Sequence, residues 1–204
     1  MNEGKANKQV EVIERTTAYA GHFSVEVLRL RHGQYDGNMG PEIRRELIDR
    51  GHAVAVLPYD SKRDEVVLIE QFRVAPYAVG DEPWMLEAIA GLIEDGEDPA
   101  DVVRREAAEE AGLTLTEVDE LLTIYTSPGA LSERITIYHA PVDASGAGGI
   151  HGVAEEGEDI RVVVMAFDGA MAALGEGRIT SGPSVVALQW LALNRDRLRR
   201  ESQA

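Results

Sequence analysis

The sequence contains no cysteine, and this absence excludes disulfide bonds, zinc–thiolate sites and catalysis by a thiol. Long apolar segments are missing as well. The longest ones, around residues 162–167 and 185–193, are too short or too interrupted to span a bilayer. The polar residues 1–14 lack the apolar core of a signal peptide, so none is expected. These features favour a cytoplasmic protein without a membrane partner.

Basic residues are scarce: 20 Lys and Arg stand against 36 Asp and Glu, which leaves a net charge of −16. Such a surface argues against broad electrostatic binding of nucleic acid or of an anionic membrane. A phosphate-bearing substrate remains possible if metal ions or a local arginine cluster neutralise it. The 204 residues are 44% hydrophobic and 27% charged, which is typical of a globular domain with at most a modest appendage.

Familiar catalytic patterns are absent too. The five histidines show no ligand spacing such as H-E-x-x-H, and each is interpreted as structural. No G-x-S-x-G is present, so nothing in the sequence indicates a serine nucleophile.

Strands dominate the predicted secondary structure. Residues 9–32 alternate like a strand until the parity slips at Arg29, which a bulge or a strand end would explain. Residues 42–50 fit either a helix or an extension of a hairpin. The other expected strands are 53–58, 66–72, 85–89, 121–125, 134–141 and 160–167, with a glycine-rich loop at 142–159 and C-terminal helices at 169–174 and 183–199. Mixed strands with few helices predict an α+β fold, with residues 1–50 as an N-terminal β extension and 51–204 as the main domain.

The clearest helix begins after Asp98, a suitable N-cap, with Pro99 at its first position and Gly112 at its end. It carries three glutamates, at positions 106, 109 and 110. Like charges at this spacing are unfavourable, and the C-terminal end of a helix dipole disfavours anions. A hard divalent cation such as Mg²⁺ would compensate them. On these charges alone, a solvated acidic face is the simpler interpretation.

The spacing of the whole segment 91–113 favours a metal site over a solvated acidic face. From Gly91, five residues lead to Glu97 and seven more to Arg105, followed by Glu-Ala-Ala-Glu-Glu-Ala-Gly-Leu. This segment resembles the Nudix box, G-x5-E-x7-R-E-U-x-E-E-x-G-U, where U is a bulky aliphatic residue. Every fixed position is filled, and Ala107 is small for the first aliphatic one. The resemblance implies a Nudix fold, with mixed sheets sandwiched by helices. It also implies metal-dependent hydrolysis of a nucleoside diphosphate linked to another group.

Each residue type in the box has a physical role. Gly91 permits a close backbone approach, and Glu97 can pair with Arg105 to fix the loop against the helix. Glu106 and Glu110 then offer oxygens to a metal. The resemblance adds the carbonyl of Ala90 as a ligand, and it makes Arg105 and Glu109 part of the catalytic set.

Beyond the box, the chain resembles bacterial ADP-ribose pyrophosphatases from about residue 10 to residue 193. The matching segments are 44–53, 68–77, 83–91, 127–134 and 151–162. The resemblance implies hydrolysis of ADP-ribose to AMP and ribose 5-phosphate by a homodimer that uses Mg²⁺, with Mn²⁺ as a possible substitute. The alternatives are a hydrolase of another nucleoside-diphosphate sugar such as GDP-mannose, or a non-catalytic nucleotide-sugar sensor. The intact box argues against a sensor.

The resemblance also implies a set of substrate-binding residues. They are His22, Phe23, Arg45, Glu46, Arg50, Arg73, Leu92, Ser127, Pro128, Gly129 and Glu133. His22 departs from the relatives, which have an aromatic residue there. Arginine suits a pyrophosphate because its planar fork makes paired, charge-assisted hydrogen bonds. The turn 127–129 matches one that reaches the neighbouring subunit's substrate, although a simple strand connection would also explain its Pro-Gly pair.

The acidic run Glu-Glu-Gly-Glu-Asp at 155–159 ends the glycine-rich loop. The resemblance implies that Glu156 activates water and that Glu158 binds metal. A solvated acidic loop is the alternative. Together with the box, the run is interpreted as part of the active site.

Overall fold

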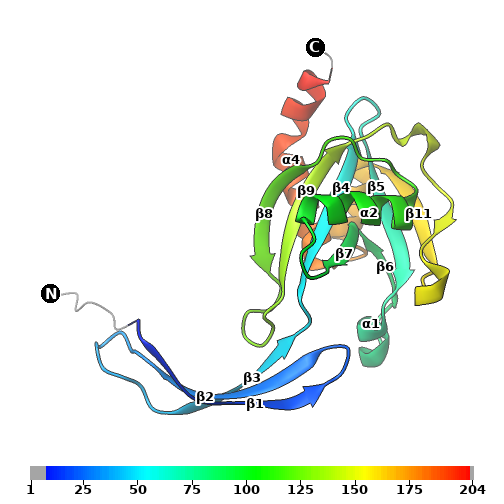
Figure 1. Cartoon of the computed structure of the whole chain (residues 1–204). Coiled ribbons are helices and arrows are strands. Elements are labelled where there is room, and N and C mark those ends of the chain that lie inside the picture. The colour runs from blue at the N-terminus through cyan, green and yellow to red at the C-terminus, as the bar shows by residue number, and fades with distance from the viewer. Residues whose placement is uncertain (1–7, 203–204) are drawn as a thin grey trace, which may run out of the picture. The chain divides into compact units, whose positions relative to one another are not determined.

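The computed structural model describes residues 8–202, and all of their side chains except that of Glu156. The chain forms two compact units (Figure 1). One unit contains the residues up to His52 together with Tyr125–Glu133, and the other contains Ala53–Ile124 and the chain from Arg134 onward.

The first unit is built on a three-stranded antiparallel sheet in the order β1-β2-β3. Its strands are β1 (Val10–Ala20), β2 (Ser24–His32) and β3 (Ile43–Asp49). The ambiguous segment 42–50 is therefore a strand. The turn after Tyr125 joins this sheet, because Ile48 donates its backbone N–H to the carbonyl of Ala130 at 2.8 Å and Leu131 bridges to Ile48.

The parity slip at Arg29 coincides with a β-bulge, one of the two expected explanations, but the extra residue lies in the neighbouring strand, opposite Leu30 and Arg29. The irregularities lie in β1, between Val12 and Glu14 and between Thr17 and Tyr19, while β2 and β3 stay in register. Arg29 remains inside β2, where its guanidinium pairs with Glu14 at 2.8 Å and with Glu42 at 2.7 Å. Cross-strand ion pairs therefore keep a charged residue in the middle of the strand.

The second unit contains the remaining strands: β4 (His52–Asp60), β5 (Glu65–Phe72), β6 (Trp84–Glu87), β7 (Ile89–Ile93), β8 (Asp119–Tyr125), β9 (Arg134–Pro141), β10 (Ile150–His151) and β11 (Ile160–Ala166). The main path of the sheet is β10-β11-β5-β4-β9-β8, with β6 paired to β5 and β7 paired to β4. Strands β4 and β9 run parallel, whereas β4 and β5 form the predicted hairpin. Two short 3-10 turns, Ala144–Gly146 and Ala154–Glu156, interrupt the predicted loop 142–159.

The single strand predicted at 85–89 is wrong, because the chain changes partner there. Strand β6 pairs with β5, and β7 pairs with β4. Ala88 lies at the change and donates its backbone N–H to the hydroxyl of Ser184 at 2.8 Å. The short helix α1 (Val74–Val79), which buries no side chain and ends at Gly80, was not predicted from the sequence either.

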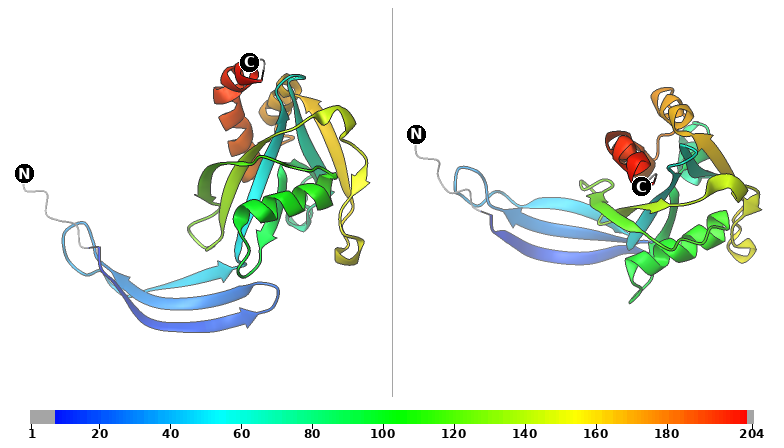
Figure 2. Two further views of the ribbon diagram at one scale, coloured as in Figure 1. Left: turned by 45° about the horizontal axis from the view of Figure 1, so that its top comes forward. Right: turned by 90° about the horizontal axis from the view of Figure 1, so that it is seen from above.

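Helices cover both faces of this sheet (Figure 2). Helix α2 (Pro99–Ala111) packs on one face, where alternate strand residues such as Val54 and Ile69 form a core with it. Helices α3 (Phe167–Gly175) and α4 (Gly182–Glu201) cover the other face. The side-chain alternation of β4 and β5 thus fills two cores, and the predicted α+β class is confirmed.

A partly buried ion-pair network attaches α4 to the β4–β5 hairpin. Asp64 adopts a left-handed backbone conformation at the turn, with φ of 63°, and pairs with Arg195 and Arg199. The hydroxyl of Tyr59 donates to the same carboxylate at 2.6 Å. The hydrogen bond from Arg195 holds the pKa of Asp64 at about 2. The C-terminal half of α4 is therefore fixed to the sheet by charge as well as by apolar packing.

Candidate active site

Helix α2 begins and ends as predicted. The Asp98 side chain accepts the backbone N–H of Ala100 at 2.9 Å, and Gly112 ends the helix with φ of 62°. Ala107, the small residue of the box, is fully buried between the helix and the sheet. Its size therefore suits the close packing of α2 on this face.

Arg105 is the centre of the contacts that fix the loop before α2. Its guanidinium lies 3.4 Å from Glu97, 2.8 Å from Glu106 and 3.2 Å from Glu109. It also donates to the carbonyl of Leu92 at 3.4 Å. The predicted pair between Glu97 and Arg105 is present, and the same guanidinium orients two neighbouring glutamates.

Glu106 and Glu110 lie against the strand residues that precede the helix. The Glu110 carboxylate is only 3% exposed and accepts the backbone N–H of Ala90 at 3.0 Å. The Glu106 carboxylate lies so close to Gly91 that a Cβ there would overlap it. Any larger residue at the start of the box would therefore force the Glu106 side chain to move away from its position beside the strand.

Burial makes these two carboxylates hard to ionise. It raises the pKa of Glu110 to about 8, and the charges of Glu106 and Glu158 act in the same direction. Burial also raises the pKa of Glu106, although Arg105 opposes this. A cation bound between the carboxylates would remove the penalty. The geometry thus favours a positive ligand at this face of α2.

The donor set fits a hard divalent cation. It consists of carboxylate and carbonyl oxygens, which suit Mg²⁺ or Mn²⁺. Within residues 8–202, no group of three or more acidic or histidine side chains could hold a metal by itself. Mg²⁺ commonly takes one or two protein carboxylates and completes its shell with water and substrate phosphates. Glu106, Glu110 and the Ala90 carbonyl are suited to that kind of site.

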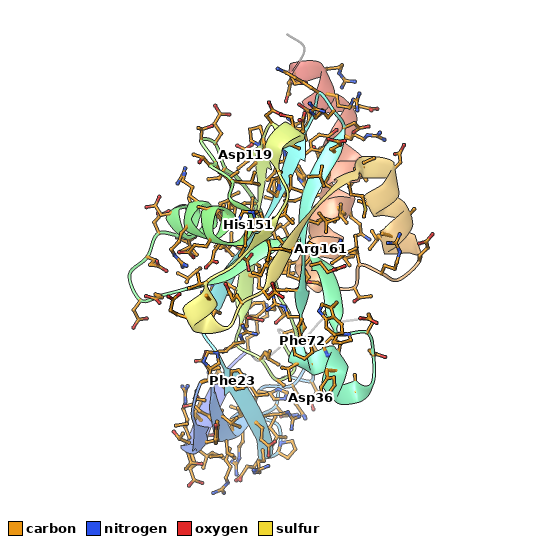
Figure 3. All side chains as sticks on the ribbon, turned by 90° about the vertical axis from the view of Figure 1, so that its right-hand side faces the viewer. Phe23, Asp36, Phe72, Asp119, His151 and Arg161 are labelled. Atoms are coloured by element: carbon orange, nitrogen blue, oxygen red, sulfur yellow. The ribbon has the colours of Figure 1, made fainter. Side chains whose placement is uncertain are left out.

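The loop that carries Glu158 is held against the C-terminal end of α2 by a hydrogen bond and by side-chain packing. Gly152 donates its N–H to the carbonyl of Glu109 at 3.0 Å, and the ring of His151, which is labelled in Figure 3, lies against Gly112. Gly152 has φ of 103°, and a Cβ there would lie 2.8 Å from Cβ of Glu158. The Glu158 carboxylate accepts the N–H of Val153 at 3.0 Å. This fastening explains why the charge of Glu158 acts on Glu106 and Glu110.

Glu156, predicted as the base, ends the 3-10 turn Ala154–Glu156. Its side chain lies outside the described part of the structure, so its role stays a prediction. Gly157 follows it in the left-handed conformation, with φ of 74°.

Arg73 is the predicted substrate residue whose charge acts on the carboxylates of α2. It follows β5, and its charge opposes the rise in the pKa of Glu110. Its Nε donates to the carboxylate of Glu87 at 2.7 Å. Sequence analysis missed Glu87, and the available signal was a single acidic residue within the apolar segment 85–90.

The first unit holds the other predicted substrate residues except Leu92. Glu133 is 5% exposed, accepts the hydroxyl of Thr126 at 2.9 Å and pairs with Arg50 at 3.2 Å. This pair flanks the turn that contains the segment 127–129. The structure therefore assembles Arg50, Glu133 and this turn within one unit.

The remaining predicted residues of this unit make local contacts. Arg45 donates to the carbonyl of Arg44 at 2.8 Å, and Glu46 accepts from the Arg44 guanidinium at 2.7 Å. His22 and Phe23 lie in the turn between β1 and β2, where their rings meet edge to face at 5.3 Å. These roles stay predictions, as does that of Leu92, which packs on the core below α3 and α4.

A family model described as the NUDIX domain matches residues 49–195. The chain belongs to the Nudix family. It is thus a Nudix hydrolase, a class of enzyme that generally uses a divalent metal, and the predicted family, fold and enzyme class are confirmed. In addition, no helix within residues 8–202 is long and apolar enough to cross a membrane.

Named relatives show which members of the Nudix family this chain is similar to. The ADP-ribose pyrophosphatase of Escherichia coli (strain K12) is 50% identical over 192 residues, which cover 94% of this chain and 92% of the relative. The ADP-ribose pyrophosphatase of Haemophilus influenzae is 41% identical over 93% of this chain and 88% of its own length. The GDP-mannose pyrophosphatase of Pectobacterium atrosepticum is 38% identical over 71% of this chain and 75% of its own. The predicted likeness to bacterial ADP-ribose pyrophosphatases is therefore confirmed.

A solved structure, titled as the crystal structure of ADP compounds hydrolase, supports the fold. It matches with a TM-score of 0.69 at 20% identity and covers 93% of this chain and 97% of that one. At this identity the likeness concerns the fold alone.

Proposed function

We propose that this Nudix hydrolase cleaves the pyrophosphate of ADP-ribose to AMP and ribose 5-phosphate, with Mg²⁺ as its metal and Mn²⁺ as a substitute. The observation that supports this most strongly is the 50% identity to an ADP-ribose pyrophosphatase along 94% of the chain. The charges of the site support the same proposal, because its buried carboxylates can bind a cation and its arginine can bind phosphate oxygens. The proposed location is the cytoplasm.

Glu106, Glu110, Glu158 and the carbonyl of Ala90 would hold the metal. A bound divalent ion polarises a phosphorus–oxygen bond and lowers the pKa of a bound water. Arg105 keeps the carboxylates of Glu106 and Glu109 in place through its two ion pairs. These carboxylates titrate as a coupled group, so a pH profile belongs to the site and not to one residue.

Glu156 would accept a proton from the attacking water, whose oxygen bonds to one phosphorus while the bridging oxygen leaves with the other. Arg73 would neutralise charge on the pyrophosphate, because its guanidinium lies near Glu110. In this scheme the chain's residues hold the metal, accept the proton and bind the phosphates.

The first unit would bind the nucleoside and ribose parts of the substrate. Phe23 is 43% exposed and is free to stack on a base. The buried Glu133 fixes Arg50 and is proposed to contact the ribose. Arg45 and Glu46 from β3 belong to the proposed set in this unit, and Leu92 is proposed as a substrate contact of the other unit.

A substrate panel tests the proposal. ADP-ribose, GDP-mannose and other nucleoside-diphosphate sugars are incubated with Mg²⁺ or with a chelator, and the products are identified. We expect the highest kcat/KM for ADP-ribose, with AMP and ribose 5-phosphate as products and no turnover with chelator. A preference for GDP-mannose would make that compound the substrate in place of ADP-ribose. Absence of any hydrolysis would favour the alternative of a non-catalytic nucleotide-sugar sensor.

We also propose that residues 1–50 form an extension for dimerisation and substrate contacts, and residues 51–204 the catalytic domain. Every residue of β1 is exposed, including the apolar Val12 at 55% and Tyr19 at 57%. An edge strand that exposes apolar side chains along its length gains stability from a partner. A second copy would also bring the turn 127–129 to the neighbouring subunit's substrate.

Replacing Val12 with lysine is expected to shift the protein from dimer to monomer and to lower kcat/KM. Sedimentation at assay concentration measures the assembly directly. Leu193→Lys is the matched control, since Leu193 is an 87% exposed apolar residue on α4. A wild-type protein that is fully active as a monomer would refute the dimer.

A further inference from the structure

Glu87 is a buried carboxylate in an apolar strand. It is 8% exposed, and it pairs in register with Ile69 of β5, whose side chain packs in the core below α2. Residues opposite one another on paired strands point to the same face of a sheet. Glu87 therefore lies on the face of α2, the helix that carries the metal carboxylates. Burial of a charge there is costly unless a partner compensates it.

The partner is Arg73, whose Nε donates to Glu87 at 2.7 Å. The backbone of Arg73 is fixed as well, because its N–H donates to the carbonyl of Pro83 at 2.8 Å. Its side chain stays 42% exposed. Among the side chains that the structure describes, none makes a hydrogen bond or ion pair with the two terminal nitrogens of Arg73, which can therefore donate to a ligand.

We propose that Glu87 is a positioning residue, which holds the Arg73 guanidinium so that its two terminal nitrogens face the substrate pyrophosphate. This inference rests on the proposed function and adds a residue that does not touch the substrate. With Nε occupied by Glu87, the guanidinium can rotate little, and its free edge offers two parallel donors to phosphate oxygens. The charge of Arg73 also acts on Glu110, so the guanidinium lies within electrostatic reach of that proposed metal ligand.

A hydrogen bond to helix α4 fixes the main chain next to Glu87, and so supports the positioning role. The next residue, Ala88, bonds to the hydroxyl of Ser184, which is 1% exposed at the start of α4. The strand change between β6 and β7 is therefore fixed from the opposite layer. Stability alone does not require a charge at position 87, because an apolar pair of similar volume is often as stable as a buried ion pair.

The test is Glu87→Gln, which keeps the size of the side chain and an acceptor oxygen but removes the charge. Loss of a charged hydrogen bond is expected to raise KM for ADP-ribose about tenfold. The value of kcat should change by less than about threefold, since the metal ligands stay in place. The matched control is Glu70→Gln: Glu70 pairs with Arg161 at 2.6 Å from the opposite face of the same sheet. Its KM should equal the wild-type value.

A double-mutant cycle separates positioning from general structure. In the Arg73→Ala background, adding Glu87→Gln should raise KM no further, because the group that it positions is absent. Independent effects of the two substitutions, or an unchanged KM in Glu87→Gln alone, would overturn the proposal. If Glu87→Gln does not fold, R73M/E87M is compared with R73M. Equal KM values support positioning, and a higher value in the double variant refutes it.

The two proposals fail in different experiments. Failure of the proposed function appears in the wild-type protein, as absence of ADP-ribose hydrolysis. Failure of the positioning role appears only in the variants, with wild-type hydrolysis intact and Arg73→Ala still impaired.

Discussion

Glu110→Gln is expected to lower turnover by several orders of magnitude while the fold stays intact. The amide has the size of the carboxylate, and its oxygen can still accept the N–H of Ala90. It lacks the negative charge with which this buried side chain would hold the metal. Steady-state kinetics over a magnesium titration measures the effect. Activity near the wild-type value at saturating magnesium would remove Glu110 from the ligand set.

The same substitution is expected to stabilise the metal-free protein. Burial raises the pKa of Glu110 from 4.5 to about 8, so the folded state keeps a proton that the unfolded state releases. The free energy of unfolding therefore falls as the pH rises between these two values, and Glu110→Gln removes this part of the slope. Thermal unfolding with chelator, at about pH 6 and about pH 9, tests it. Glu117→Gln, at an exposed position after α2, should keep the wild-type slope.

The sequence was most informative where function depends on local spacing. The start of α2 at Asp98, its end at Gly112 and the pair between Glu97 and Arg105 could all be predicted, because their partners lie within one loop and one helix. The arrangement of Glu106 against Gly91 was foreseen only as a close approach of the backbone. Its physical cause is the carboxylate itself, which occupies the space of a Cβ.

Long-range contacts explain the failures. The strand predicted at 85–89 is divided because Ala88 bonds to Ser184, which lies 96 residues further along the chain. No local pattern reports such a partner. Glu87 was missed for a related reason: its role depends on Arg73, across the pair of strands β5 and β6. Alternation indicated an irregularity near Arg29 but not that its extra residue lies in the partner strand β1. Ion pairs with Glu14 and Glu42 keep Arg29 itself in the ladder.

Substitutions of Glu156 and Glu158 in the acidic loop are expected to differ in how added magnesium affects the lost activity. Glu158 lies on a segment that is fastened to α2 through Gly152, and its charge acts on Glu106 and Glu110. This arrangement agrees with the ligand role that we propose for Glu158. Glu158→Gln should therefore weaken metal binding, and additional magnesium should restore part of the lost rate.

Glu156→Gln should behave differently, because a missing proton acceptor cannot be replaced by metal. Removal of a general base typically lowers the rate by about 10²–10⁴-fold. Substrate and metal affinity should stay near the wild-type values, since the ligands on α2 and Arg73 remain. Magnesium titrations of both variants, with substrate affinity measured separately, distinguish the roles, and Glu155→Gln from the same turn is the control. Equal rescue of both variants by magnesium would make both residues ligands, and Glu109, held by Arg105, would become the next candidate for the base.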